Sequence, residues 1–153
     1  MTKLVGISVL AIFSLRGMAH EGHGIPGALP PALHGGVVQE AEHKGNNVHS
    51  GKEEVELFFE AVYKDKEITV YPLTFPKDST STFQTISAKK DLSGVALMVE
   101  LPRAKKMEPL KATVTDDGIK ATFDSKNANR FIVHVTAKHM QEEKMAKIQI
   151  EKN

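Results

Sequence analysis

Histidine is the residue type whose number and spacing in this sequence most clearly indicate chemistry. Five of the seven histidines fall within a thirty-residue stretch: His20, His23, His34, His43 and His49. Neutral imidazole is the commonest nitrogen ligand for zinc, copper and nickel ions. The chain contains no cysteine, so a transition-metal site must be built from His, Met, Asp or Glu. These five histidines are the candidate metal ligands, and Cu, Zn or Ni is the candidate ion.

The residues between these histidines indicate flexible segments. Residues 20–33 are rich in Gly, Pro and Ala, and we call them the N-terminal arm; residues 40–53 form a second polar segment, the link. A flexible segment can gather several imidazoles around one ion, because metal binding offsets the entropy lost on ordering. The competing interpretation is that these are surface loops whose polar residues include histidines that bind nothing. The sequence leaves both interpretations open.

The first nineteen residues resemble an export signal. Lys3 precedes the short apolar run Val5–Leu15, and the small residues Gly17 and Ala19 suit a cleavage site. The run is too short for a membrane span, which needs roughly 20 residues. We therefore predict a signal peptide at residues 1–19, no membrane span after its removal, and a periplasmic or secreted protein. A buried N-terminal helix is the alternative.

Cleavage after Ala19 would give His20 a special role. Its α-amino nitrogen and its imidazole could then chelate one ion together, and His23 could supply a third nitrogen. Such a nitrogen set suits Cu(II), which prefers tetragonal N ligands. A copper monooxygenase using His20 is a further hypothesis. The absence of tryptophan and the presence of only two tyrosines weaken a polysaccharide-binding surface of that kind.

Charge and motif content argue against two large classes of function. Removing Lys3 and Arg16 from the 20 basic side chains leaves 18 against 19 acidic ones, a formal net charge of −1. Nucleic-acid binding relies on a basic surface, so we expect no nucleic-acid partner. The sequence has no nucleophile motif, no HExxH and no phosphate-binding glycine loop. We therefore expect a protein that is not an enzyme.

From His34 onward, apolar residues alternate with polar ones, which predicts β-strands with one buried face. Leu57, Phe59 and Ala61 alternate with Glu56, Phe58 and Glu60, and Leu97 and Val99 share a second apolar face. Val55 and Val95 would extend these two faces, and turns are predicted at 64–66 and at 116–118. The pattern predicts an all-β protein, an antiparallel β-sandwich of about seven to nine strands spanning residues 34–153, behind the flexible N-terminal arm. A closed barrel is the alternative.

We expect the remaining histidines and the methionines to have structural roles. His134 is expected in the middle of a strand, on the face opposite Val133 and Val135, and His139 in a turn. Met98, Met107, Met140 and Met145 are scattered along the sequence and form no methionine-rich motif. We expect Met98 to pack against its neighbours.

One part of the chain resembles a known group of proteins. A His-Gly-Gly-Val strand at His34–Val37, a Glu-Leu pair at Glu56–Leu57 and a strand ending in Val70–Tyr71 look like small exported β-domains associated with bacterial heavy-metal efflux, including N-terminal modules of periplasmic adaptor proteins. The resemblance covers residues 34–73. The chain departs from it in its longer link with two additional histidines and in lacking the helical hairpin of a full adaptor.

These observations lead to two hypotheses of function. The first is a periplasmic protein that binds copper, zinc or nickel and buffers the metal or transfers it to efflux machinery. The resemblance implies a heavy-metal efflux complex as partner. The second hypothesis is a metal-free interaction module that docks to an envelope complex.

Overall fold

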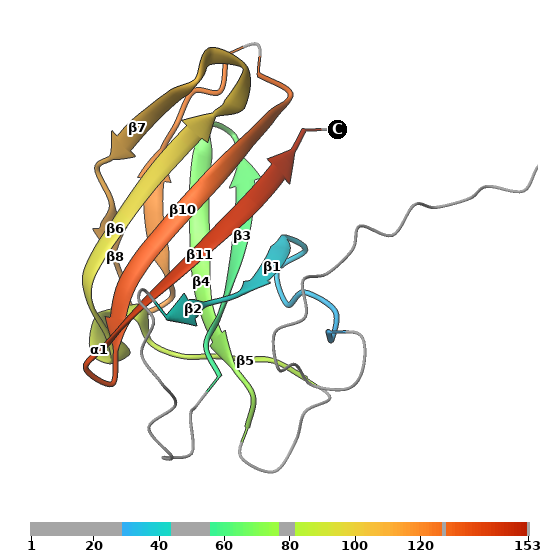
Figure 1. Cartoon of the computed structure of the whole chain (residues 1–153). Helices are drawn as coiled ribbons and strands as arrows, with labels where there is room; N and C mark the ends of the chain where they lie inside the picture. The colour runs from blue at the N-terminus through green and yellow to red at the C-terminus, as the bar shows by residue number, and fades with distance from the viewer. Residues whose placement is uncertain (1–28, 44–55, 77–81, 127, 153) are drawn as a thin grey trace, which may run out of the picture.

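The computed structural model describes residues 29–43, 56–76, 82–126 and 128–152, and these form an all-β domain (Figure 1). The described residues contain eleven strands: β1 (Val37–Glu40), β2 (Glu42–His43), β3 (Phe58–Lys64), β4 (Glu67–Thr74), β5 (Gln84–Thr85), β6 (Leu92–Leu101), β7 (Lys106–Leu110), β8 (Thr113–Val114), β9 (Ile119–Thr122), β10 (Arg130–His139) and β11 (Glu142–Glu151). The predicted signal peptide lies outside these residues, as do residues 20–28 of the N-terminal arm.

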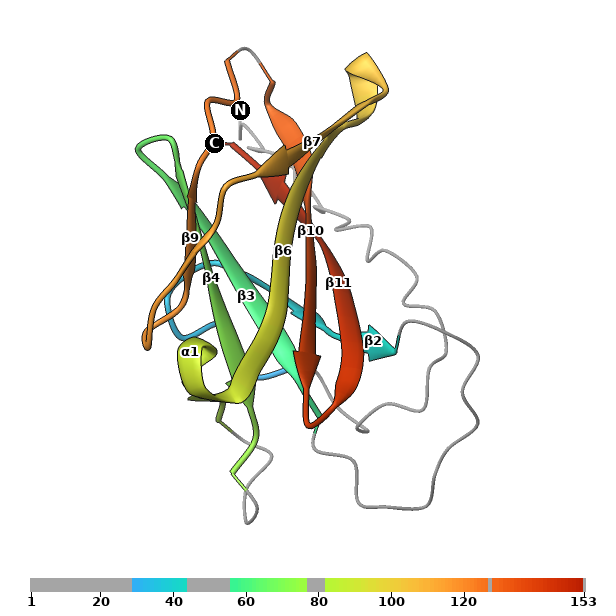
Figure 2. The same ribbon diagram turned by 90° about the vertical axis from the view of Figure 1, so that its left-hand side faces the viewer.

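The strands form two antiparallel sheets, so the predicted β-sandwich is confirmed. One sheet has the order β1-β3-β4-β9-β8, with β5 also paired to β4, and the other has the order β2-β11-β10-β6-β7. We call these sheet A and sheet B. Figures 1 and 2 show sheet B lying across sheet A as a separate layer. The strand number exceeds the predicted seven to nine because β2, β5 and β8 have only two residues each, too few to produce a visible alternation.

Tight turns join the longest strand pairs. Asp65 and Lys66, between β3 and β4, have φ values of 52° and 64°. Met140 and Gln141, between β10 and β11, have φ values of 50° and 72°. Two consecutive left-handed residues match the right-handed twist of the flanking strands. The predicted turn at 64–66 is confirmed.

The N-terminal segment belongs to both sheets. β1 pairs with β3 in sheet A and β2 pairs with β11 in sheet B. Between them, Ala41 is buried and its N–H donates to the Leu57 carbonyl at 2.8 Å. The segment therefore closes one side of the sandwich (Figure 1) and fixes the direction from which the preceding residues approach sheet A.

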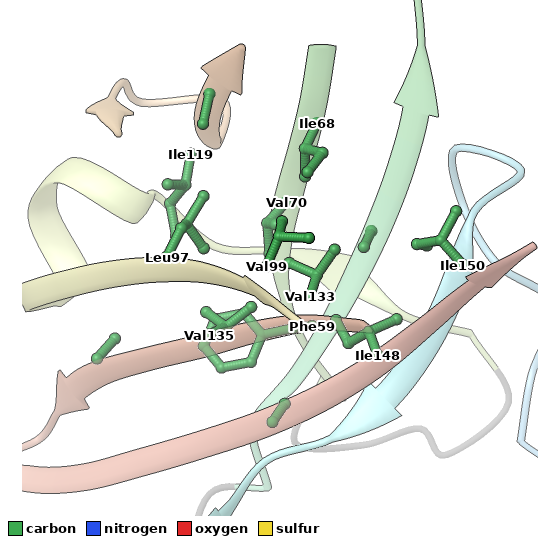
Figure 3. Packing of buried hydrophobic residues seen from close by; sticks show 14 of the residues in the cluster. Phe59, Ile68, Val70, Leu97, Val99, Ile119, Val133, Val135, Ile148 and Ile150 are labelled. Atoms are coloured by element: carbon green, nitrogen blue, oxygen red, sulfur yellow. The ribbon is translucent and has the colours of Figure 1, made fainter. Parts of the chain in front are cut away.

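The core lies between the sheets and is aliphatic for the most part (Figure 3). Leu57 directly precedes β3, Phe59 and Ala61 belong to β3, and Leu97 and Val99 come from β6; none of the five exposes more than 2% of its surface. Both predicted inner faces are therefore confirmed, although Val95 is only partly buried against the core and Val55 lies outside the described residues. The sheet B strands β10 and β11 add the other large members: Phe131, Val133, Val135, Ile148 and Ile150.

The alternation predicts one buried face for β3, and this prediction is wrong. Phe58 and Glu60 point away from the sheet interface, yet both are fully buried. Phe58 packs with Leu73 and Phe83 in a second hydrophobic cluster on the outer face of sheet A. Residues 33–36 cover Glu60 through hydrogen bonds described below. The first four residues of β3 are thus buried on both faces, because residues 33–36 and Phe83 lie over the outer face of sheet A.

Helical structure within the described residues is limited to α1 (Ala88–Asp91) and a 3-10 turn, η1 (Pro102–Ala104). Ser87 caps α1 by accepting a hydrogen bond from the Lys90 N–H at 3.2 Å. None of the described helices is long and apolar enough to cross a membrane.

Candidate metal-ligand site at His34

The candidate site is built on the outer face of sheet A. Glu60 in β3 and Tyr71 in β4 are directly opposite each other in the strand register, so their side chains share one face. The segment Leu33–Gly36 precedes β1 and crosses this face. His34 is the predicted metal ligand that this segment carries.

Glu60 holds the segment through both carboxylate oxygens. Oε1 accepts the backbone N–H groups of His34 and Gly36, each at 2.8 Å, and Oε2 accepts the N–H of Leu33 at 3.0 Å. The His34 Nδ1 atom lies 3.0 Å from the same Oε2. A buried carboxylate is costly unless its oxygens are satisfied, and here backbone and imidazole donors supply the required partners.

These hydrogen bonds keep Glu60 ionised. Burial by itself raises the pKa of the Glu60 carboxyl, but the Gly36 N–H and the side chain and N–H of His34 outweigh it, so that the pKa lies below its usual value. An ionised carboxylate can only accept hydrogen bonds. His34 Nδ1 must therefore carry the hydrogen and donate it to Glu60.

The tautomer of His34 follows from this contact. With the hydrogen on Nδ1, a neutral imidazole presents its lone pair on Nε2, the usual metal-binding atom. No described residue pairs with Nε2, and 31% of the side-chain surface is exposed. A histidine whose other nitrogen donates to a carboxylate is the common arrangement around bound metals, since the carboxylate fixes the ring and raises its basicity.

Tyr71 fixes the plane of the same ring. The His34 and Tyr71 rings are stacked, with centroids 3.6 Å apart and planes 9° from parallel. Tyr71 also packs against the cluster of Phe58, Leu73 and Phe83. The imidazole is therefore held at its edge by Glu60 and on one face by Tyr71, which leaves little rotational freedom to lose when it binds a ligand.

The two glycines after His34 are required by the backbone. Gly35 has a φ of +75°, a conformation that glycine adopts without a steric penalty. A Cβ on Gly36 would lie 2.4 Å from the Ala61 carbonyl oxygen and 2.8 Å from a Val62 methyl. Gly36 thus permits the close approach to β3 that brings His34 over Glu60.

His43 lies elsewhere, in the short β2 strand of sheet B. The Lys144 Nζ atom is 2.8 Å from its Nε2, and a Glu142 carboxylate oxygen is 3.6 Å from its Nδ1. Lys144 is itself buried and also contacts Glu142 at 3.3 Å. The Lys144 Nζ atom lies where a metal ion would have to approach Nε2, so His43 is poorly prepared for metal in this arrangement.

The other predicted ligands, His20, His23 and His49, lie outside the described residues. Within the described ranges, no three His, Asp or Glu side chains are grouped closely enough to hold a metal ion. The structure therefore places His34 and His43 at different sites and leaves the full ligand set a prediction.

Sequence reasoning missed the partner of His34. The resemblance pointed to Glu56 and Leu57, whereas the carboxylate that binds His34 belongs to Glu60, four residues later. One signal was available in the run "LFFEAV". Glu60 shares its face of the strand with Phe58, and a solvent-exposed face would not be expected to carry a phenylalanine. Tyr71 was included in the resemblance, but its contact with His34 was not foreseen.

In comparisons with known proteins, no family model, curated protein or solved structure matches this chain.

Proposed function

We propose that this protein is an exported transition-metal-binding protein in which His34 is the ligand fixed by the fold. The observation that supports the proposal best is the contact of Glu60 with Nδ1 of His34 at 3.0 Å. It directs Nε2 away from the carboxylate and orients it for an ion such as Cu, Zn or Ni. One imidazole does not complete a site, so the proposal assigns the remaining nitrogens to His20 and His23 of the N-terminal arm.

The proposed biological role is to buffer the metal or transfer it to efflux machinery in the periplasm. This role rests on the resemblance of residues 34–73 to domains associated with heavy-metal efflux and on the predicted signal peptide. Mass analysis of exported protein is expected to find His20 at the mature N-terminus. A retained Met1, or a cut beyond His23, would remove the proposed N-terminal chelate.

Isothermal titration of the mature protein with Cu(II), Zn(II) and Ni(II) tests the proposal. We expect His34→Ala to weaken binding most, and His20→Ala or His23→Ala to weaken it by a smaller factor. His139→Gln is the matched control. His139 is not in the turn where we expected it but is the last residue of β10 and is buried in sheet B, so the metal affinity of this variant should equal that of the unmodified protein. Binding no tighter than that of an unstructured peptide with the same histidines would contradict the proposal.

A specific observation also favours the second candidate, an interaction module. Leu29, Leu33 and Val37 are large apolar residues that expose 46%, 41% and 43% of their surface. Val37 belongs to β1, which stands at the end of the sheet A order. An edge strand with exposed apolar residues can accept a partner strand by β-augmentation. If the metal titration fails, this surface becomes the leading explanation for the function.

A further inference from the structure

The C-terminal half of β11 forms an edge of sheet B. In the strand order, β11 lies between β10 and the short β2. β10 pairs with β11 along its whole length, whereas β2 reaches only Lys144 and Met145. β11 continues past β2 toward the C-terminus (Figure 1). Among the described parts of the chain, residues 147–151 therefore have a strand neighbour on the β10 side alone, and we call them the edge segment.

The strand β1 does not occupy this edge. It lies near β11, but all four of its residues pair with β3 of sheet A. Within the described residues, no loop or side chain forms a hydrogen bond with the backbone of the edge segment. The backbone groups on the open side of the segment can therefore bond to a strand from outside the domain.

The alternation of hydrogen bonds decides which backbone groups face the open side. Just beyond β11, the Lys152 N–H donates to the Asn129 carbonyl, next to β10, at 2.8 Å. In an antiparallel pair such bonded positions recur at every second residue, so Ile148 and Ile150 also bond to β10. The other residues of the edge segment direct their N–H and C=O groups to the open side: Lys147, Gln149 and Glu151.

The side chains of the same three residues share the outer face of sheet B. Ile148 and Ile150 point into the core, so Lys147, Gln149 and Glu151 point outward, and all three are exposed. Lys147 has no hydrogen-bond or ion-pair partner among the described residues. Glu151 accepts a hydrogen bond from Nε2 of Gln149 at 2.9 Å. The edge segment therefore presents a cation, an amide and an anion in sequence.

The edge segment, KIQIE, is complementary to itself when two copies run antiparallel. A two-fold axis at Gln149 places each Lys147 directly opposite Glu151 of the partner subunit. Residues in this relation have Cβ atoms about 4.5–5.5 Å apart, close enough for an ion pair. Because these positions all have outward backbone groups, each pair also exchanges two N–H···O hydrogen bonds.

The charges select this register over its neighbours. Sliding one strand by two residues brings Gln149 opposite a charged residue, and sliding it by four brings two lysines or two glutamates together. Sliding it by one residue sets side chains of the core face opposite side chains of the outer face. In the matched register, Glu151 lies between Lys147 of the partner subunit and Arg130, its own neighbour on β10.

We propose that the edge segment is a homodimer interface, at which two copies of this chain join their B sheets into one continuous antiparallel sheet. A two-fold contact of this kind uses the same surface on both subunits. An open edge can attract any exposed strand, but Lys147 and Glu151 favour the one strand that carries the same charges in reverse order. The interface is independent of His34 and of the β1 surface described above.

Sedimentation velocity over a range of protein concentrations measures the dissociation constant of the dimer. EDTA is present, so that a bridging metal ion cannot contribute. We expect the mature protein to show a monomer–dimer equilibrium that shifts toward monomer as salt is added. Gln149→Pro removes an N–H that bonds to nothing within the described domain, a change that an edge strand tolerates, and should abolish the dimer. Gln149→Ala keeps this N–H and should still dimerise.

A charge exchange tests the register. Lys147→Glu and Glu151→Lys each place like charges opposite each other at both ends of the interface, and each should raise the dissociation constant by roughly tenfold. The double variant Lys147→Glu/Glu151→Lys should dimerise more tightly than either single variant. Lys89→Glu, an exposed position in α1, is the matched control and should dimerise like the parent. Thermal unfolding in dilute solution confirms that each variant is folded.

Amide hydrogen exchange locates the contact. In concentrated protein, the amides of Lys147, Gln149 and Glu151 should exchange more slowly than in dilute protein, because they gain hydrogen bonds across the interface. The amides of Ile148 and Ile150 bond to β10 in either state, so they should already be protected in dilute solution.

Any of three results would overturn the homodimer. A protein that stays monomeric at every concentration would leave this edge to a strand of a different protein. A dimer that Gln149→Pro leaves intact would place the contact between subunits elsewhere. A double charge variant that dimerises no more tightly than the single variants would reject the pairing of Lys147 with Glu151.

Discussion

Glu60 is the residue on which the order of the His34 segment depends most. It is fully buried, and it accepts three backbone N–H groups as well as the imidazole of His34. A carboxylate in this position acts as a template, because each donor must occupy a defined point around it. The same residue therefore affects both the stability of the fold and the orientation of the proposed metal ligand.

Glu60→Ala should test both roles. Hydrogen bonds to charged groups contribute about 1.5–3 kcal/mol each, but the freed N–H groups can turn to water. We expect the free energy of unfolding to fall by about 1.5–3 kcal/mol in urea denaturation, together with weaker metal binding at His34. Glu67→Ala is the matched control on the neighbouring strand, since Glu67 is 47% exposed, and should change stability by less than about 0.5 kcal/mol. Equal effects of the two substitutions would contradict the template role.

A buried histidine should make stability depend on pH. Burial lowers the pKa of His139 below its usual value and Lys144 acts in the same direction, whereas Asp91 and Glu142 act against them. The unfolded chain then binds the proton more readily, so this contribution to stability is present above pH ~6.5 and is lost as the pH falls from there toward the lower folded pKa. Urea unfolding should therefore show a steeper loss of stability below pH ~6.5 in the parent than in His139→Gln. Parallel curves would mean that His139 does not contribute.

At the scale of elements, the contact between the His34 segment and β3 depends on Gly36, because any side chain at this position would collide with β3. A methyl group on Gly36 would meet the Ala61 carbonyl oxygen at 2.4 Å, so Gly36→Ala must push the start of β1 away from β3 and weaken the bond to Glu60. Gly35→Ala meets no atom within 4 Å and costs only the strain of a left-handed residue, roughly 1–2 kcal/mol. Urea unfolding should show a larger loss for Gly36→Ala, and metal titration should show weaker binding at His34. A smaller loss for Gly36→Ala than for Gly35→Ala would contradict the close packing of β1.

The sequence predicted those elements whose side chains obey a simple rule. Alternation identified the inner faces of β3 and β6 because core packing enforces a period of two, and turn residues identified the β3–β4 connection. Alternation also led to the wrong expectation for Glu60, because it reports which residues share a face but not what folds over that face. The contact of His34 with Glu60, and of His134 with Glu100, joins residues 26 and 34 positions apart. Such pairs follow from strand register, which local patterns do not encode.

For the molecule as a whole, the sandwich places the two described candidate ligands on different sheets. His34 lies over the outer face of sheet A, whereas His43 lies in β2, at the end of the sheet B order. The aliphatic core of Figure 3 lies between the two sheets. The fold therefore does not bring these two imidazoles to one ion, and the proposed function takes the further ligands of His34 from the N-terminal arm.

The number of histidines that join His34 in the first site can be counted from the pH dependence of affinity. An imidazole binds metal only after losing its proton, whose pKa in water is about 6.5. Below that pH, log Kd should therefore increase by about one for each histidine ligand when the pH is lowered by one unit. If His34 acts with His20 and His23, Zn(II) titrations between pH 5 and 6 should give a slope of about three, increased further if the α-amino group of His20 also binds. His34→Ala should lower the slope by one, whereas His139→Gln should leave it unchanged. A slope of one in the parent protein would mean that the N-terminal arm contributes no imidazole, and that His34 binds metal alone.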